Sequence, residues 1–103
     1  MDTQVRHESH KNRFIANVQG GEAILKYRRG PGNSYDLLST NAPEEARGQN
    51  IGDKLVRSAI QVAKDENVQI IGTCPYVRHW FEKHPEERAI LWNGDQPQME
   101  AFF

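Results

Sequence analysis

The segment of the chain best suited to chemistry combines a cation with small residues, just before a run of helical period. Residues 47–52 read Arg-Gly-Gln-Asn-Ile-Gly, and an amphipathic pattern follows them directly. Backbone amides at a helix start, together with the positive end of the helix dipole, favour a bound anion. Glycine and asparagine tolerate the left-handed backbone that such a loop requires. The pattern therefore predicts an anion site formed by Arg47, Gly48, Gln49, Asn50, Ile51 and Gly52.

The loop by itself is a weak signal, and a second interpretation is that its glycines only permit a tight entry into the helix. The segment has no Gly-Lys-Ser/Thr ending, which argues against a nucleoside-triphosphate loop. Its glycine spacing also does not match the dinucleotide fingerprint. Its position between a strand and a helix favours the functional interpretation.

Three further side chains could carry group-transfer chemistry. Cys74 follows an apolar strand and precedes a helix start, a position that favours the thiolate and hence a nucleophile. Tyr76 and His79 are three residues apart, on one face of that helix, where either could donate or accept a proton. The alternative for Cys74 is a small buried apolar residue, and for Tyr76 ordinary packing. For His79 the alternative is a solvated polar face.

The elements that must position these residues form an antiparallel meander followed by a βαβ unit. Apolar residues between 51 and 64 recur with a period of 3.6, which predicts a helix of about four turns. A strand on each side of that helix makes a right-handed crossover between parallel neighbours. A second helix is expected over residues 76–84, after Pro75. The predicted strands span residues 13–18, 23–27, 35–40, 68–73 and 87–92, with a weaker signal near Val5.

Two segments of the chain resemble the GNAT N-acetyltransferase superfamily. Residues 43–56 look like its acetyl-CoA-binding motif, Gln/Arg-x-x-Gly-x-Gly/Ala, in which Arg47 and Gly52 match the ends and Asn50 replaces the central glycine. Residues 74–77 (Cys-Pro-Tyr-Val) and 81–86 (Phe-Glu-Lys-His-Pro-Glu) are similar to a short, single-domain subgroup with a cysteine at the end of a strand. The resemblance covers roughly residues 14–87.

The resemblance implies a minimal α/β (α+β) fold with two main helices and parallel strands that splay apart. It implies that the CoA pyrophosphate lies on residues 47–52, continued by Asp53, and that the pantetheine arm runs along Ser39, Thr40 and Asn41. Acetyl would pass to an unidentified primary amine, directly or through Cys74, with Tyr76 or His79 exchanging protons. The alternative is a catalytically weak CoA-binding or protein-interaction module of the same fold.

Length and composition limit the number of domains and the kinds of partner and location that we expect. The 103 residues suit one domain, with 93–103 as a tail that is either flexible or packed. Lys+Arg 13 against Asp+Glu 14 gives no basic field for nucleic acid, and no apolar stretch approaches the roughly 20 residues that span a membrane. One cysteine suits a reducing, cytoplasmic location, and the four histidines suggest no metal site. We expect a monomer or weak homodimer.

Overall fold

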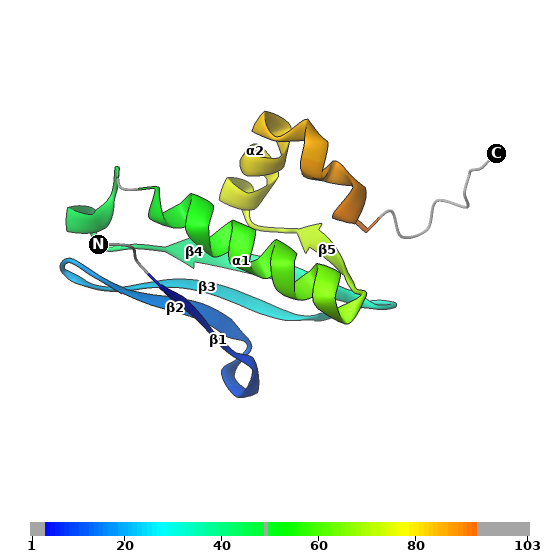
Figure 1. The fold of residues 1–103 in the computed structure, drawn as a ribbon, viewed down its shortest axis with the longest axis horizontal. Helices are drawn as coiled ribbons and strands as arrows, with labels where there is room; N and C mark the ends of the chain where they lie inside the picture. The colour runs from blue at the N-terminus through cyan, green and yellow to red at the C-terminus, as the bar shows by residue number, and fades with distance from the viewer. Residues whose placement is uncertain (1–3, 49, 93–103) are drawn as a thin grey trace.

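A computed structural model describes residues 4–48 and 50–92 of the chain. Within these residues one sheet has the strand order β1-β2-β3-β4-β5 (Figure 1). Neighbours are antiparallel from β1 to β4, whereas β4 and β5 are parallel. The predicted meander, the crossover and the weakly signalled first strand are therefore confirmed. The strands are β1 Val5–Glu8, β2 Arg13–Val18, β3 Gly21–Gly30, β4 Ser34–Asn41 and β5 Gln69–Gly72.

Two helices dominate the rest of the fold. Helix α1 covers Ile51–Glu66 and ends at Asn67, whose left-handed backbone (φ 63°) donates its amide to carbonyls of the last turn. Helix α2 covers Pro75–Lys83, with proline at the start, where its missing amide hydrogen costs nothing. Short 3-10 turns occupy Ser9–Lys11 and Glu44–Ala46. Both helices begin within one residue of the predicted starts.

The core forms where the apolar side of α1 covers one face of the sheet. On the sheet, alternate residues such as Phe14, Leu25, Tyr27 and Leu37 belong to this core, as the two-residue period of strands requires. In Figure 1, α1 runs along the sheet and α2 lies beside it at the β5 end. The buried residues of α1 are Ile51, Leu55, Val56, Ala59, Ile60 and Ala63.

An irregularity in β4 lies where the pairing of the parallel strands ends. Lys26 pairs with Ser39 but Tyr27 pairs with Leu37, so Leu38 is an extra, bulged residue in β4. The β4–β5 pairing ends at Leu37 and Gly72, and the amide of Cys74 donates to the Leu37 carbonyl over 2.8 Å. Beyond this point β4 continues to Asn41 while the other chain segment turns into α2. The parallel strands therefore separate, as the predicted fold class requires.

The predicted last strand over residues 87–92 is wrong for most of its length. Pro85–Ile90 forms a 3-10 helix instead, and only Leu91 makes an isolated bridge to Ile70. Pro85 at the first position of this element, followed by two acidic residues in its first turn, favours a new helical start over an extended chain. The predicted tail, residues 93–103, lies outside the described residues.

Candidate active site

A cavity lies where the separated end of β4 meets the start of α1. Its volume is about 380 Å³, within the usual range for small-molecule sites. It brings together residues from β4, from the loop before α1, from the first turn of α1 and from α2. Its lining residues are Thr40, Asn41, Ala42, Arg47, Gly48, Asn50, Ile51, Gly52 and Tyr76.

The loop has the backbone conformation that its residue types predict. Asn50 (φ 58°) and Gly48 (φ 88°) are left-handed. Asn50 is the N-cap of α1 and makes no side-chain capping bond, while its carbonyl accepts the first helical bond from Lys54. The leading amides of α1 are therefore left without the side-chain oxygen that usually satisfies them. Such amides, beside the Arg47 guanidinium, provide donors suited to phosphate oxygens.

Tyr76 lies over the first turn of α1, and Gly52 makes this approach possible. A Cβ atom at Gly52 would lie 2.5 Å from the Tyr76 hydroxyl oxygen, closer than any real contact. The Tyr76 side chain is 42% exposed and forms part of the cavity wall. Burial raises its pKa, and the negative charge of Asp53 raises it further. The Tyr76 phenol therefore holds its proton at neutral pH.

Cys74 lies just behind the cavity, at the cap position of α2. Its Sγ is 3.5 Å from the hydroxyl oxygen of Thr40, and Thr40 lines the cavity. The residue is 4% exposed and does not itself line the cavity. The structure thus brings Cys74 next to Thr40, whereas the Tyr76 hydroxyl lies beside Gly52 at the start of α1.

The other predicted site residues lie apart from the cavity wall. Ser39 pairs across the sheet with Lys26, and strand alternation points its side chain to the opposite face from Thr40. The carboxylate of Asp53 accepts a hydrogen bond from the Trp80 indole. The His79 ring is 60% exposed and lies 3.6 Å from a Glu82 oxygen on the solvent side of α2. Gln49 lies outside the described residues.

Two structural features near the site were not predicted from the sequence. Ala42 lines the cavity directly after β4. Asp36, which is buried in β4, accepts hydrogen bonds from Arg28 of β3 and from the hydroxyl of Thr73, which directly follows β5. An acidic residue inside an apolar strand was the available sign, since a buried carboxylate requires partners.

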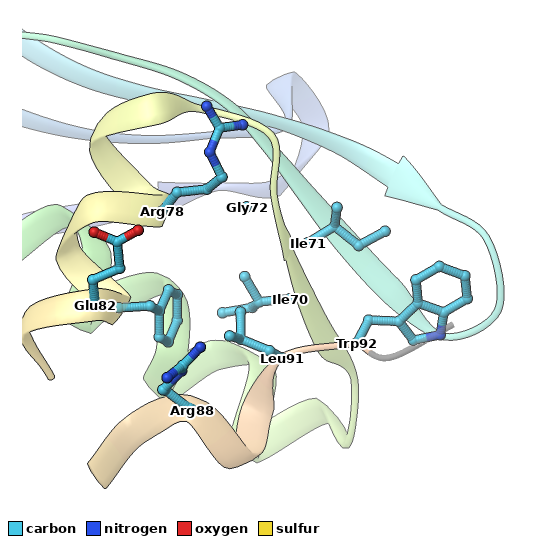
Figure 2. A pocket seen from close by; sticks show the side chains of 9 residues that line it. Ile70, Ile71, Gly72, Arg78, Glu82, Arg88, Leu91 and Trp92 are labelled. Atoms are coloured by element: carbon cyan, nitrogen blue, oxygen red, sulfur yellow. The ribbon is translucent and has the colours of Figure 1, made fainter. Parts of the chain in front are cut away.

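A second cavity of about 300 Å³ lies on the other flank of α2. Figure 2 shows Arg78 and Glu82 of α2 on one side of it, and Ile71 and Trp92 on the other. It contains none of the predicted site residues. Among residues 4–48 and 50–92, no three His, Cys, Asp or Glu side chains group as metal ligands. None of the helices in that part of the chain is long and apolar enough to cross a membrane.

Known proteins resemble this chain in sequence and in fold. The model of the GCN5-related N-acetyl-transferase family matches residues 13–90. Protein NATD1 of Danio rerio is 26% identical over 89 residues, covering 84% of this chain and 81% of that protein. The human NATD1 protein is 25% identical over 84 residues, covering 80% and 74%.

The fold also has a counterpart among solved structures. A GCN5-like protein from Staphylococcus aureus, determined by NMR in solution, superposes with a TM-score of 0.70 over 86% of this chain and 87% of its own. The sequence identity of 23% makes this a likeness of fold alone. The family model spans most of the chain and confirms the resemblance that the loop motif indicated. The chain therefore belongs to the GCN5-related N-acetyltransferase family.

Proposed function

We propose that this chain binds acetyl-CoA in the cavity at the start of α1 and transfers the acetyl group to a primary amine. The observation that carries the proposal is the convergence of uncapped α1 amides, Arg47 and Tyr76 on one cavity at the separated end of β4. The residues present fit the group. Gly52 has no side chain, the Tyr76 ring that lies beside it is partly exposed and can turn aside, and the amide donors suit a diphosphate.

The diphosphate would lie on the loop and the first turn of α1. Gly48, Asn50, Ile51 and Gly52 line this part of the cavity, and Arg47 supplies a positive charge at its rim. Hydrogen bonds from backbone amides to an anion are charge-assisted and stronger than neutral ones. We propose that these contacts provide most of the affinity for the cofactor.

The pantetheine arm would follow the unpaired end of β4. Thr40 and Asn41 line the cavity beyond the last residue that pairs with β5, so their backbone groups are available on that edge. The arm would thus lead from the α1 loop toward Thr40 and Cys74. We propose that Thr40 and Asn41 contact the pantetheine arm. Ser39, the preceding residue of β4, would help to position them.

We place the reacting end of the cofactor at Thr40 and Cys74, which Tyr76 at the start of α2 would reach by turning its hydroxyl away from Gly52. Bound acetyl-CoA supplies a thioester carbonyl that a neutral amine can attack. The Tyr76 phenol, whose pKa is raised by burial, would give its proton to the sulfur as the carbon–sulfur bond breaks, while the amine loses a proton to solvent. We propose direct transfer with Tyr76 as the acid. We propose His79 as the alternative acid, although its side chain is exposed to solvent in this structure.

A covalent route through Cys74 is a variant of the same function. Its sulfur lies 3.5 Å from the Thr40 hydroxyl at the reacting end, and the residue stands directly before the first residue of α2. If this route operates, intact-mass measurement after incubation with acetyl-CoA shows one added acetyl group, which the Cys74→Ala variant lacks. An unmodified thiol during turnover leaves direct transfer.

Thermal unfolding in the presence of acetyl-CoA tests the binding. Because the ligand binds only the folded chain, a concentration of 100 times its Kd stabilises by about 2.7 kcal/mol and raises the Tm. The Gly52→Glu variant should lose this shift, since it places bulk and negative charge where phosphate binds. A Tm that does not change at millimolar acetyl-CoA contradicts the proposal.

A second candidate function is a CoA-binding module without efficient turnover. The lining of the cavity favours it in one respect, because the described residues of that lining include no carboxylate or imidazole that could deprotonate the amine. Binding of acetyl-CoA without any product from a panel of small amines and lysine peptides would support the module.

The single cysteine is unpaired and buried, and we propose that the protein works in the reducing cytoplasm.

A further inference from the structure

The carboxylate of Asp53 is held by two partners on the side of α1 that faces α2. Its Oδ1 accepts a hydrogen bond of 2.8 Å from the indole Nε1 of Trp80. Arg57, one turn along α1, donates to both carboxylate oxygens at 3.0 and 3.1 Å. The Arg57 guanidinium also lies 5.2 Å from the centre of the Trp80 ring. We call Asp53, Arg57 and Trp80 the α1–α2 clasp.

Trp80, the indole donor of this clasp, is buried and packed against two neighbouring rings. Its ring is 4% exposed, meets Phe81 edge-on, and stacks on the ring of His84 with 4.0 Å between centroids. His84 is fixed in turn by a 2.8 Å bond between its Nδ1 and the Trp80 carbonyl. A buried indole bound to a carboxylate is a charge-assisted pair with little freedom to reorient.

The position of Asp53 makes its orientation important for the anion site. It is the third residue of α1, directly after Gly52, which lines the cavity. An acidic side chain in the first turn of a helix is drawn to the same uncapped amides that would bind a phosphate. A free Asp53 would therefore compete with the diphosphate for those amides and repel it. The negative charge of Asp53 acts on Tyr76, which lines the cavity, and raises the pKa of its phenol.

We infer that the α1–α2 clasp holds the Asp53 carboxylate away from the anion site, so that the first amides of α1 stay available to the diphosphate of CoA. This inference rests on the proposed function and assigns Asp53 a positioning role in place of a direct contact with the cofactor. Trp80 then connects the site to α2, since one helix supplies both the indole and Tyr76.

The test is calorimetric titration with CoA and, separately, with inorganic pyrophosphate. Trp80→Phe keeps an aromatic ring but removes the indole donor, so we expect the Kd for both probes to rise about tenfold. Asp53→Asn keeps an acceptor for the indole without the charge, and should bind within about twofold of the parent chain. The decisive variant combines Asp53→Asn with Trp80→Phe. Without a charged competitor, it should regain most of the lost affinity.

Arg57→Gln gives an independent measure, because Arg57 is half-exposed and its replacement spares the core. We expect a rise in Kd of about threefold, which adding Asp53→Asn removes. If Trp80→Phe binds both probes like the parent chain, or if the double variant stays as weak as Trp80→Phe, the clasp is refuted. If the parent chain itself binds neither probe, the proposed function fails and the inference fails with it.

Discussion

Replacing Gly52 with alanine should weaken the binding of CoA while leaving the stability of the fold almost unchanged. The new Cβ would lie 2.5 Å from the hydroxyl oxygen of Tyr76 and 2.7 Å from its Cζ, so the ring must move. It is able to move, because it is the far end of a side chain that is 42% exposed. In helical backbone, a change from glycine to alanine stabilises by about 0.4–1 kcal/mol. Displacing a half-buried ring costs about as much.

Gly52→Ala should therefore leave the free energy of unfolding within about 0.5 kcal/mol of the parent chain. Affinity for CoA responds differently, since the methyl group and the displaced ring enter the space that phosphate oxygens need beside the amides. Amide-to-phosphate bonds require separations of about 2.9 Å, so we expect the Kd for CoA to rise about tenfold or more. Urea denaturation measures the first quantity and calorimetric titration the second.

Gly48→Ala is the matched control. Gly48 has a φ of 88°, and an added Cβ there meets nothing within 4 Å, so its cost is backbone strain without a clash. It should lower the free energy of unfolding by about 1 kcal/mol, in contrast with Gly52→Ala. Two results would refute the reasoning about Gly52. One is a loss of more than about 2 kcal/mol, which means that Tyr76 cannot move; the other is unchanged affinity for CoA.

Three further substitutions probe the site and the fold. Tyr76→Phe removes the proposed acid but keeps the ring, so kcat should fall about 100-fold while the Kd for CoA changes little; equal loss in both contradicts the assignment. His7 lies 2.6 Å from the Tyr27 hydroxyl, and burial lowers its pKa from 6.5. The folded chain then binds fewer protons than the unfolded chain, so stability falls as the pH drops below about 6.5. His7→Gln should flatten that dependence in Tm measurements between pH 7.5 and 5. Tyr35→Phe removes a hydrogen bond to Glu66 and should cost about 1–2 kcal/mol in urea denaturation, and no loss would show that the bond is absent in solution.

Local patterns in the sequence predicted the elements that position the site. The apolar repeat predicted helix α1, and the residue types of the loop predicted a left-handed backbone, which the structure has at Asn50. The separation of β4 from β5 followed from the family resemblance. By contrast, the strand predicted over residues 87–92 is wrong for most of its length, because Pro85 starts a 3-10 helix that continues to Ile90.

Interactions between distant parts of the chain were not accessible from the sequence. Asp53 and Trp80 are 27 residues apart, and no local pattern indicates that the indole binds the carboxylate. His79 shares a helix with Tyr76, yet only the packing of α2 shows that it faces solvent beside Glu82. The close approach of Tyr76 to Gly52 likewise depends on how α2 docks. Spacing along a helix fixes relative directions, but not the face that packs.

The most direct test of the central claim is an NMR titration of the ¹⁵N-labelled chain with CoA. We predict that the backbone amides of Ile51, Gly52 and Asp53 show the largest shifts, with Thr40 and Asn41 following. Free phosphate at the same concentration should reproduce the α1 shifts alone and more weakly. Shifts confined to residues of the second cavity, such as Ile71 and Arg88, or no shifts at millimolar CoA, would contradict the account.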